Sequence, residues 1–90
     1  MENKLNNKYN TKDIYLSAAL IALGACYDSV DKSNPKQMIF YFTQPEAKDE
    51  FTQPFDFEKV ERNWVNRILL VNARFFEDAL KSLKSVVHSS

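Results

Sequence analysis

The sequence predicts one α+β domain, in which a small antiparallel sheet packs against about three helices in the order α-β-β-α-β-α. Three observations lead to this prediction. Residues 11–23 are apolar almost all round a helical wheel, which is typical of a helix at the centre of a domain. Residues 37–43 are rich in aromatic side chains and lie between turn-forming residues, which favours a strand. Residues 72–88 repeat apolar side chains with the period of a helix that rests one face on a core.

The composition is that of a single globular domain. The chain has 90 residues, of which 44% are hydrophobic and 13% aromatic, and a chain of this length builds one hydrophobic core. Residues 1–9 are polar and lack periodicity, so we expect a flexible tail ahead of one compact domain over residues 10–90. The formal net charge is zero, although acidic side chains gather in residues 46–61 and basic ones in residues 62–90. We expect two surface regions of opposite sign that neutralise each other.

The first helix is expected to be the centre of the core. Past its first turn, Ser17 is its one polar side chain, so the helix must be covered on several sides. Its N-cap is predicted at Asn10, which has the spacing of a capping-box variant with Asp13, or at Thr11 one residue later. Gly24 is the one glycine of the sequence, and it stands where a residue in the left-handed conformation ends a helix.

A β-hairpin is predicted after this helix. Residues 26–30 and 37–43 read as its two strands, joined by a loop over residues 31–35. The side chains of the second strand alternate between two largely apolar faces: Met38, Phe40 and Phe42 on one, and Ile39, Tyr41 and Thr43 on the other. A strand that is covered on one side is normally polar on the other. We therefore expect Ile39 and Tyr41 to be covered by a partner, or within the monomer by residues 44–55.

The second half of the chain is predicted to hold two or three helices. Residues 43–46 have capping-box spacing, so a short acidic helix is expected from there through Phe51. A further helix is expected from Asp56, with a narrow apolar stripe of Phe57, Val60 and Trp64. Residues 68–71 fit either an extension of that helix or a short third strand, and their β-branched ends favour the strand. Asn72 is the predicted cap of the last helix.

Several stretches together resemble a family of small uncharacterised domains of bacterial and phage proteins. They are T-K-D-I-Y-L-S-A-A-L at residues 11–20 followed by Gly24, F-x-F at residues 40–42, and L-K-S-L-K at residues 80–84. The resemblance runs from about residue 10 to residue 88 and implies a shared fold and a phage or mobile-element origin. The family has no assigned function, so it implies no catalytic residue. Residues 44–54 depart from its pattern as extra length.

The inventory of reactive groups argues against an enzyme. His88 is the one histidine and is expected to be solvated at the end of the last helix. Cys26 is expected to pack as a small hydrophobe, and a single cysteine excludes an internal disulfide or a thiolate metal cluster. The acidic side chains are expected to be solvated rather than to bind a metal: Asp28, Asp31, Glu46, Asp49 and Glu50. We predict no catalytic residue, no cofactor and no small-molecule substrate.

The polar start of the sequence and its short apolar runs favour a cytoplasmic protein, or one in the host cytoplasm if a phage encodes it. The longest apolar run, residues 18–23, is too short to cross a bilayer. Residues 1–9 lack the apolar stretch of a signal peptide.

The leading functional hypothesis is a non-enzymatic protein-interaction module that binds a protein partner or forms a homodimer. Its predicted interaction surface contains exposed aromatic, aliphatic and basic side chains: Tyr27, Ile39, Tyr41, Trp64 and Arg67. The alternative is a single-stranded nucleic-acid-binding module, because aromatic side chains on a sheet beside basic ones can stack bases and contact phosphates. The zero net charge and the lack of a basic run count against this alternative.

Overall fold

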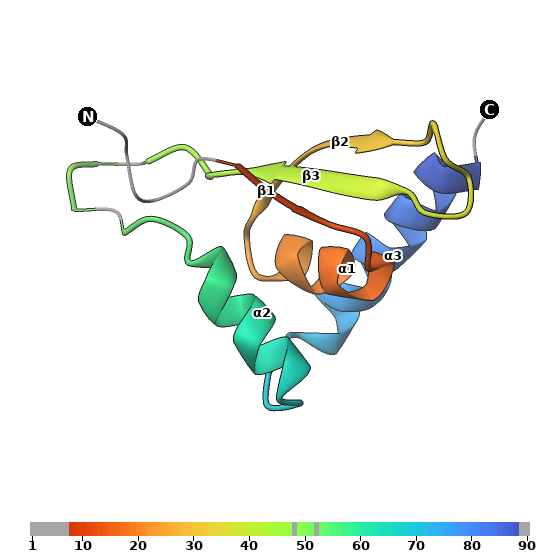
Figure 1. Ribbon diagram of the computed structural model, residues 1–90. Coiled ribbons are helices and arrows are strands. Elements are labelled where there is room, and N and C mark those ends of the chain that lie inside the picture. The colour runs from red at the N-terminus through yellow and green to blue at the C-terminus, as the bar shows by residue number, and fades with distance from the viewer. Residues whose placement is uncertain (1–7, 48, 52, 89–90) are drawn as a thin grey trace.

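A computed structural model describes residues 8–47, 49–51 and 53–88. It confirms the predicted class: a three-stranded antiparallel sheet packs against three helices (Figure 1). In chain order the elements are β1 (Lys8–Thr11), α1 (Ile14–Ala22), β2 (Cys26–Asp31), β3 (Ile39–Thr43), α2 (Phe57–Val65) and α3 (Ala73–His88).

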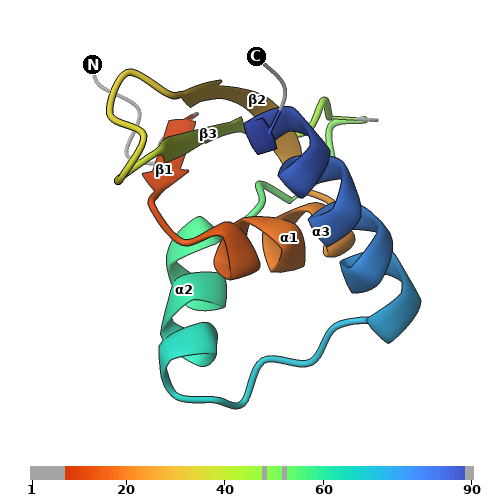
Figure 2. The ribbon, with the colours of Figure 1, turned by 90° about the vertical axis from the view of Figure 1, so that its right-hand side faces the viewer.

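The molecule has two layers, because all three helices lie on the same face of the sheet (Figures 1 and 2). The strand order is β1-β3-β2, so the aromatic-rich strand β3 is central and both of its neighbours are edge strands. The predicted hairpin is confirmed as β2 and β3, with a register shift between Tyr27 and Ser29 that marks a β-bulge. Under the sheet, α1 lies between α2 and α3 (Figure 2).

The third strand is not where the sequence analysis placed it. It is β1, which pairs with β3 from Lys8 opposite Thr43 to Thr11 opposite Phe40, whereas residues 68–71 form a loop without regular secondary structure. An edge strand needs backbone hydrogen bonds from one neighbour and an apolar side chain only where it meets the core. In β1 the side chain opposite the buried Phe42 is Tyr9, so a mostly polar strand is sufficient.

The predicted acidic helix through Phe51 is also wrong. The described residues between Gln44 and Phe55 form turns and irregular backbone, in a loop that extends past the end of β3 (Figure 1). Two hydrogen bonds close the base of this loop: Gln44 Nε2 donates to the Phe55 carbonyl oxygen at 2.8 Å, and the Phe55 N–H donates to Gln44 Oε1 at 2.7 Å. Because the Gln44 side chain joins the two ends of the loop, the chain reaches α2 without a helix between.

The core forms where α1 meets the sheet and α3, as predicted. Residues 16–20 of α1 are all buried, and they pack with β3, α2 and α3 through Phe40, Phe42, Phe57 and Leu83. Ser17 is fully buried, and its hydroxyl donates to the Asp13 carbonyl oxygen at 2.9 Å. This bond within the helix satisfies the polar group, so a serine is tolerated at the centre of the domain.

The N-cap of α1 is Asp13 rather than Asn10 or Thr11. Asp13 Oδ1 accepts hydrogen bonds from the backbone N–H groups of Tyr15 at 2.8 Å and Leu16 at 3.2 Å. Asn10 and Thr11 belong to β1, and they lie too early in the chain to cap a helix whose first residue is Ile14.

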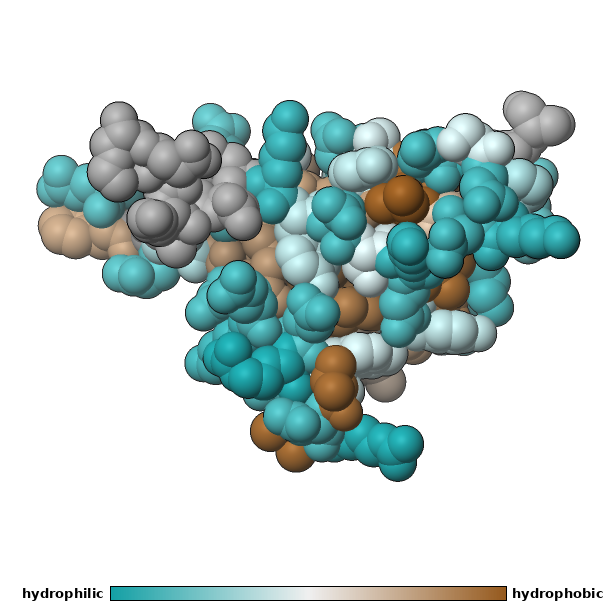
Figure 3. Space-filling view, viewed as in Figure 1, coloured by the Kyte–Doolittle hydropathy of each residue, from teal (hydrophilic) through white to brown (hydrophobic). Residues whose placement is uncertain are grey.

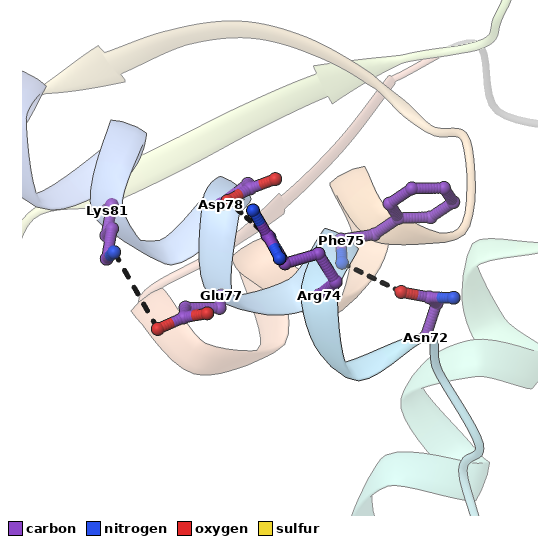
Figure 4. Close-up of polar contacts among 6 residues, drawn as sticks. All are labelled: Asn72, Arg74, Phe75, Glu77, Asp78 and Lys81. Carbon is purple, nitrogen blue, oxygen red and sulfur yellow. Dashed lines mark hydrogen bonds and ion pairs between the residues drawn. The ribbon is translucent and has the colours of Figure 1, made fainter.

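The predicted cap of the last helix is confirmed, and the helix expected from Asp56 has that residue as its N-cap. Asp56 Oδ1 accepts from the Lys59 N–H at 3.0 Å, and Asn72 Oδ1 accepts from the Phe75 N–H at 2.9 Å (Figure 4). The outer face of α3 carries two exposed i,i+4 ion pairs, Arg74 with Asp78 and Lys81 with Glu77 (Figure 4). Each contributes only a few tenths of a kcal/mol.

Both α1 and α2 end in the same hydrogen-bonded motif, but with different residues at its strained position. In α1 the Gly24 N–H donates to the Ile21 carbonyl and the Ala25 N–H to the Leu20 carbonyl, which is a Schellman motif with glycine at φ 108°. In α2 the equivalent residue is Arg67, at φ 64°. A left-handed arginine costs about 1–2 kcal/mol relative to a right-handed one, whereas glycine adopts the conformation freely.

Opposite effects on stability are therefore expected from changes at these two positions. Gly24→Val should lower the free energy of unfolding by more than about 1 kcal/mol, because a β-branched residue is strained at positive φ. Arg67→Gly should raise it by about 0.5 kcal/mol, since the relieved strain exceeds the entropy lost by ordering glycine. Urea denaturation followed by circular dichroism measures both. A Gly24→Val midpoint equal to that of the parent would contradict the assigned helix end.

Candidate interaction surface

The face of the sheet that carries no helix is mainly polar. Opposite residues in an antiparallel pair share a face, so the register places Ile39 and Tyr41 of β3 on this open face together with Thr43 of the same strand. Five side chains of the edge strands share this face: Lys8, Asn10, Cys26, Ser29 and Asp31. Ile39 and Tyr41 are half-buried among them. The edge strands therefore supply the polarity that β3 lacks.

A shallow cavity of about 280 Å³ lies on this open face. It is lined by both charge signs, Lys8 and Asp28, together with the Tyr41 ring. The Ser29 hydroxyl donates to Asp28 Oδ2 at 2.9 Å. A carboxylate beside the lysine and the aromatic ring makes the cavity a poor fit for a phosphate backbone.

Tyr27 lies on the opposite, helix-covered face and does not join Ile39 and Tyr41. It is opposite Phe42 in the register, and the two rings meet edge to face at 5.8 Å between centroids. Burial raises the pKa of the Tyr27 hydroxyl above its usual range. The sequence analysis grouped Tyr27 with Ile39 and Tyr41 without predicting the register of β2, which a bulge shifts between Tyr27 and Ser29.

Trp64 and Arg67 lie at the other end of the molecule, in and after the last turn of α2. Trp64 is half-buried, and its indole N–H donates to Asp13 Oδ2 at 3.2 Å. Arg67 is exposed. The five residues of the predicted interaction surface therefore do not form one surface: two lie on the open face of the sheet, and Tyr27 and Trp64 pack against the core.

The aliphatic side chains with the highest exposed fractions lie instead where α2 ends and the α2–α3 loop begins. Val65, Ile68 and Leu70 are 68%, 64% and 87% exposed, and we call these three residues the loop patch. Figure 3 shows apolar side chains that protrude among hydrophilic ones at this end of the molecule. In a Schellman motif the residue after the left-handed one normally packs on the residue five positions before it. Here Ile68 would meet the polar Asn63, so it has no apolar partner in the motif.

An apolar groove lies beside the start of α3. It has a volume of about 530 Å³, and it is lined by the end of α1 and the residues just after it (Ile21, Ala22, Leu23 and Gly24) and by α3 (Phe75, Asp78, Ala79 and Ser82). We call it the α1–α3 groove. The Phe75 ring, 58% exposed, reaches toward the end of α1 (Figure 4). Apart from Asp78 and Ser82, its lining is apolar or glycine.

The titratable groups of the described residues form no reactive cluster. His88 is exposed at the last position of α3, and no group of three or more histidine, cysteine, aspartate or glutamate side chains in residues 8–47, 49–51 and 53–88 is placed to hold a metal ion. Cys26 is exposed rather than packed as a small hydrophobe, because it lies on the open face opposite Thr43.

Tyr9 is the most perturbed of the titratable groups, and its role is structural. Its hydroxyl donates to Glu61 Oε1 at 2.8 Å, and its ring stacks on Phe57 at 5.0 Å between centroids. Burial first, and then the Glu61 carboxylate, raise the pKa of this hydroxyl well above its usual range. The bond holds β1 against α2.

Within the described part of the chain, no helix has the length and apolar character needed to cross a membrane. Comparisons of the sequence with protein-family models and with curated proteins, and of the structure with solved structures, found no match. The resemblance to the family of small bacterial and phage domains stays a prediction.

Proposed function

We propose that this protein is a non-enzymatic interaction module that binds a protein through the loop patch. The exposure of Val65, Ile68 and Leu70 supports this proposal above all other observations. Burying one such side chain completely against a partner gains about 1.5–3 kcal/mol. Large aliphatic side chains that stay in water, rimmed by polar groups, are the usual mark of a binding surface.

The position of the loop patch supports the same reading. The Schellman motif and the Asn72 cap fix both ends of the α2–α3 loop, so the patch is held between two helices that pack on α1. A pre-ordered surface loses less entropy on binding than a mobile one. A place among bacterial or phage proteins, as the resemblance implies, is part of the proposal and fits an adaptor of this kind.

Single-stranded nucleic-acid binding is the less favoured function. It would use Tyr41 and Lys8 on the open face, where Asp28 and Asp31 supply opposing charge. The loop patch is aliphatic, and it offers no aromatic ring on which a base can stack.

Leu70→Lys is expected to abolish partner binding and to leave the fold intact, because Leu70 is 87% exposed. The measurement is affinity capture from cells of the native host by the tagged parent and variants, with bound proteins quantified by mass spectrometry. Phe51→Lys is the matched control, since Phe51 is 77% exposed in the loop between β3 and α2, away from the patch. The proposal predicts proteins that the parent and Phe51→Lys retain and that Leu70→Lys loses. Equal recovery by all three would contradict it.

A further inference from the structure

The loop patch is apolar and lies beside the basic Arg67, and the α1–α3 groove is largely apolar and is lined by the acidic Asp78. We propose that the α1–α3 groove of one molecule binds the loop patch of a second copy of this chain. This inference rests on the proposed function, because it takes the loop patch as the binding surface and names its partner.

Both surfaces are apolar at their centres. The groove offers Ile21, Leu23, Phe75 and Ala79, and the loop patch offers the side chains of Ile68 and Leu70. A volume of about 530 Å³ lies within the range of pockets that bury a drug-sized ligand, so it has room for two aliphatic side chains. Gly24, Ala79 and Ser82 are small, which lets the backbone of an incoming loop approach closely.

The charges around the two surfaces are opposite. The groove is formed at the C-terminal end of α1, where the helix dipole is negative and the last turn holds no basic residue. Asp78 adds a carboxylate to its lining. Beside the loop patch lies instead the exposed Arg67, between Val65 and Ile68 in the sequence. An arginine of one copy beside Asp78 of the other would therefore pair opposite charges and fix the orientation of the loop.

Asp78 is able to accept this second cation. Its bond to Arg74 in the same helix is long, 3.8 Å, and both side chains are more than half exposed. Such a pair contributes little, and a carboxylate offers two oxygens with about four acceptor positions. Arg67 itself holds a left-handed conformation that glycine would adopt without strain. The arginine at position 67 therefore lowers folding stability relative to a glycine at the same position.

The arrangement of the two surfaces favours a closed dimer. The α2–α3 loop leads directly into the first turn of α3, and the end of α1 lies beside α3 (Figure 2). Leu70 in the patch and Phe75 in the groove are therefore close in sequence and at the same end of the molecule. A two-fold axis at this end would let each copy give one loop and receive the other, so that both grooves are filled.

The experiment is sedimentation velocity on the purified full chain over a wide concentration range, with circular dichroism to check the fold of each variant. The parent should show a monomer–dimer equilibrium. Leu70→Lys should raise the dimer Kd at least about a hundredfold, because the two-fold dimer loses one buried aliphatic contact in each of its two grooves. Ser82→Trp, which fills the groove, should do the same. Phe51→Lys should leave the Kd unchanged.

A charge exchange tests the orientation. Arg67→Asp and Asp78→Arg should each raise the dimer Kd about threefold to fivefold, and the double variant should restore the parent value. The inference is overturned by a parent that stays monomeric at every concentration, by a dimer that Ser82→Trp leaves intact, or by open-ended oligomers. A monomeric parent whose loop patch still captures a different protein would overturn this inference and leave the proposed function standing. A dimer insensitive to Leu70→Lys would likewise overturn this inference, whereas the capture experiment with Leu70→Lys tests the proposed function separately.

Discussion

Leu83→Ala is expected to lower the free energy of unfolding by about 2–5 kcal/mol, which is a large part of the total stability of a domain of this size. Leu83 is 2% exposed and lies in α3, within the core cluster that includes Leu16, Leu20 and Phe40. Truncation removes its apolar contacts and leaves a cavity that the neighbouring side chains of α1 and β3 cannot fill completely.

Urea denaturation followed by circular dichroism measures this effect. Leu70→Ala is the matched control: the same atoms are removed from a side chain that is 87% exposed, so a change within about 0.5 kcal/mol is expected. If Leu83→Ala does not fold, Leu83→Met tests the same contact with a smaller loss. Equal midpoints for the Leu83 and Leu70 variants would show that α3 does not complete the core.

Asp13→Ala is expected to cost about 2–3 kcal/mol, more than the usual loss of an N-cap. One carboxylate oxygen accepts from the Tyr15 and Leu16 N–H groups, and the other accepts from the Trp64 indole at 3.2 Å. The side chain therefore caps α1 and also joins α1 to α2. Asp13→Asn should cost less, since asparagine caps a helix equally well.

A double-mutant cycle with Trp64→Phe separates the two contributions. The indole–carboxylate bond is missing in both single variants, so the double variant should cost less than the sum of the two. Chemical denaturation followed by circular dichroism applies to all four proteins, including those without tryptophan fluorescence. Strictly additive costs would show that the bond contributes nothing to stability.

Elements with strong local signals were predicted correctly from the sequence. Gly24, Asp56 and Asn72 mark helix ends through their own backbone preferences or side-chain acceptors, and neighbours along the chain suffice to read them. The alternation of Phe40 and Phe42 with Ile39 and Tyr41 likewise follows from strand geometry alone.

The errors concern elements that depend on residues distant in the sequence. β1 is defined by its backbone pairing with β3, so its sequence of Lys8 to Thr11 shows no pattern. Because β1 extends to Thr11, α1 begins later than predicted and its N-cap is Asp13. Residues 68–71 were interpreted as a short third strand because of their β-branched ends, but they form a loop in which the Ile68 and Leu70 side chains are exposed.

Dependence on residues distant in the sequence also explains why the candidate site was predicted only in part. Ile39 and Tyr41 were correctly assigned to one face of β3, but the polar neighbours on that face come from β1 and β2. The sequence of β3 does not show which residues of these two strands pair with it. The α1–α3 groove is formed by residues more than fifty positions apart in the sequence. No local pattern could predict it.

The central position of α1 has a consequence for synthesis on the ribosome. β1, α1 and both strands of the hairpin are synthesised before α3, which supplies Ala79 and Leu83 to the core. Until α3 is made, one side of α1, which is apolar nearly all round, is exposed to water. Nascent chains of this protein therefore present an apolar helix of the kind that aggregates or engages chaperones, and they lose it when α3 docks.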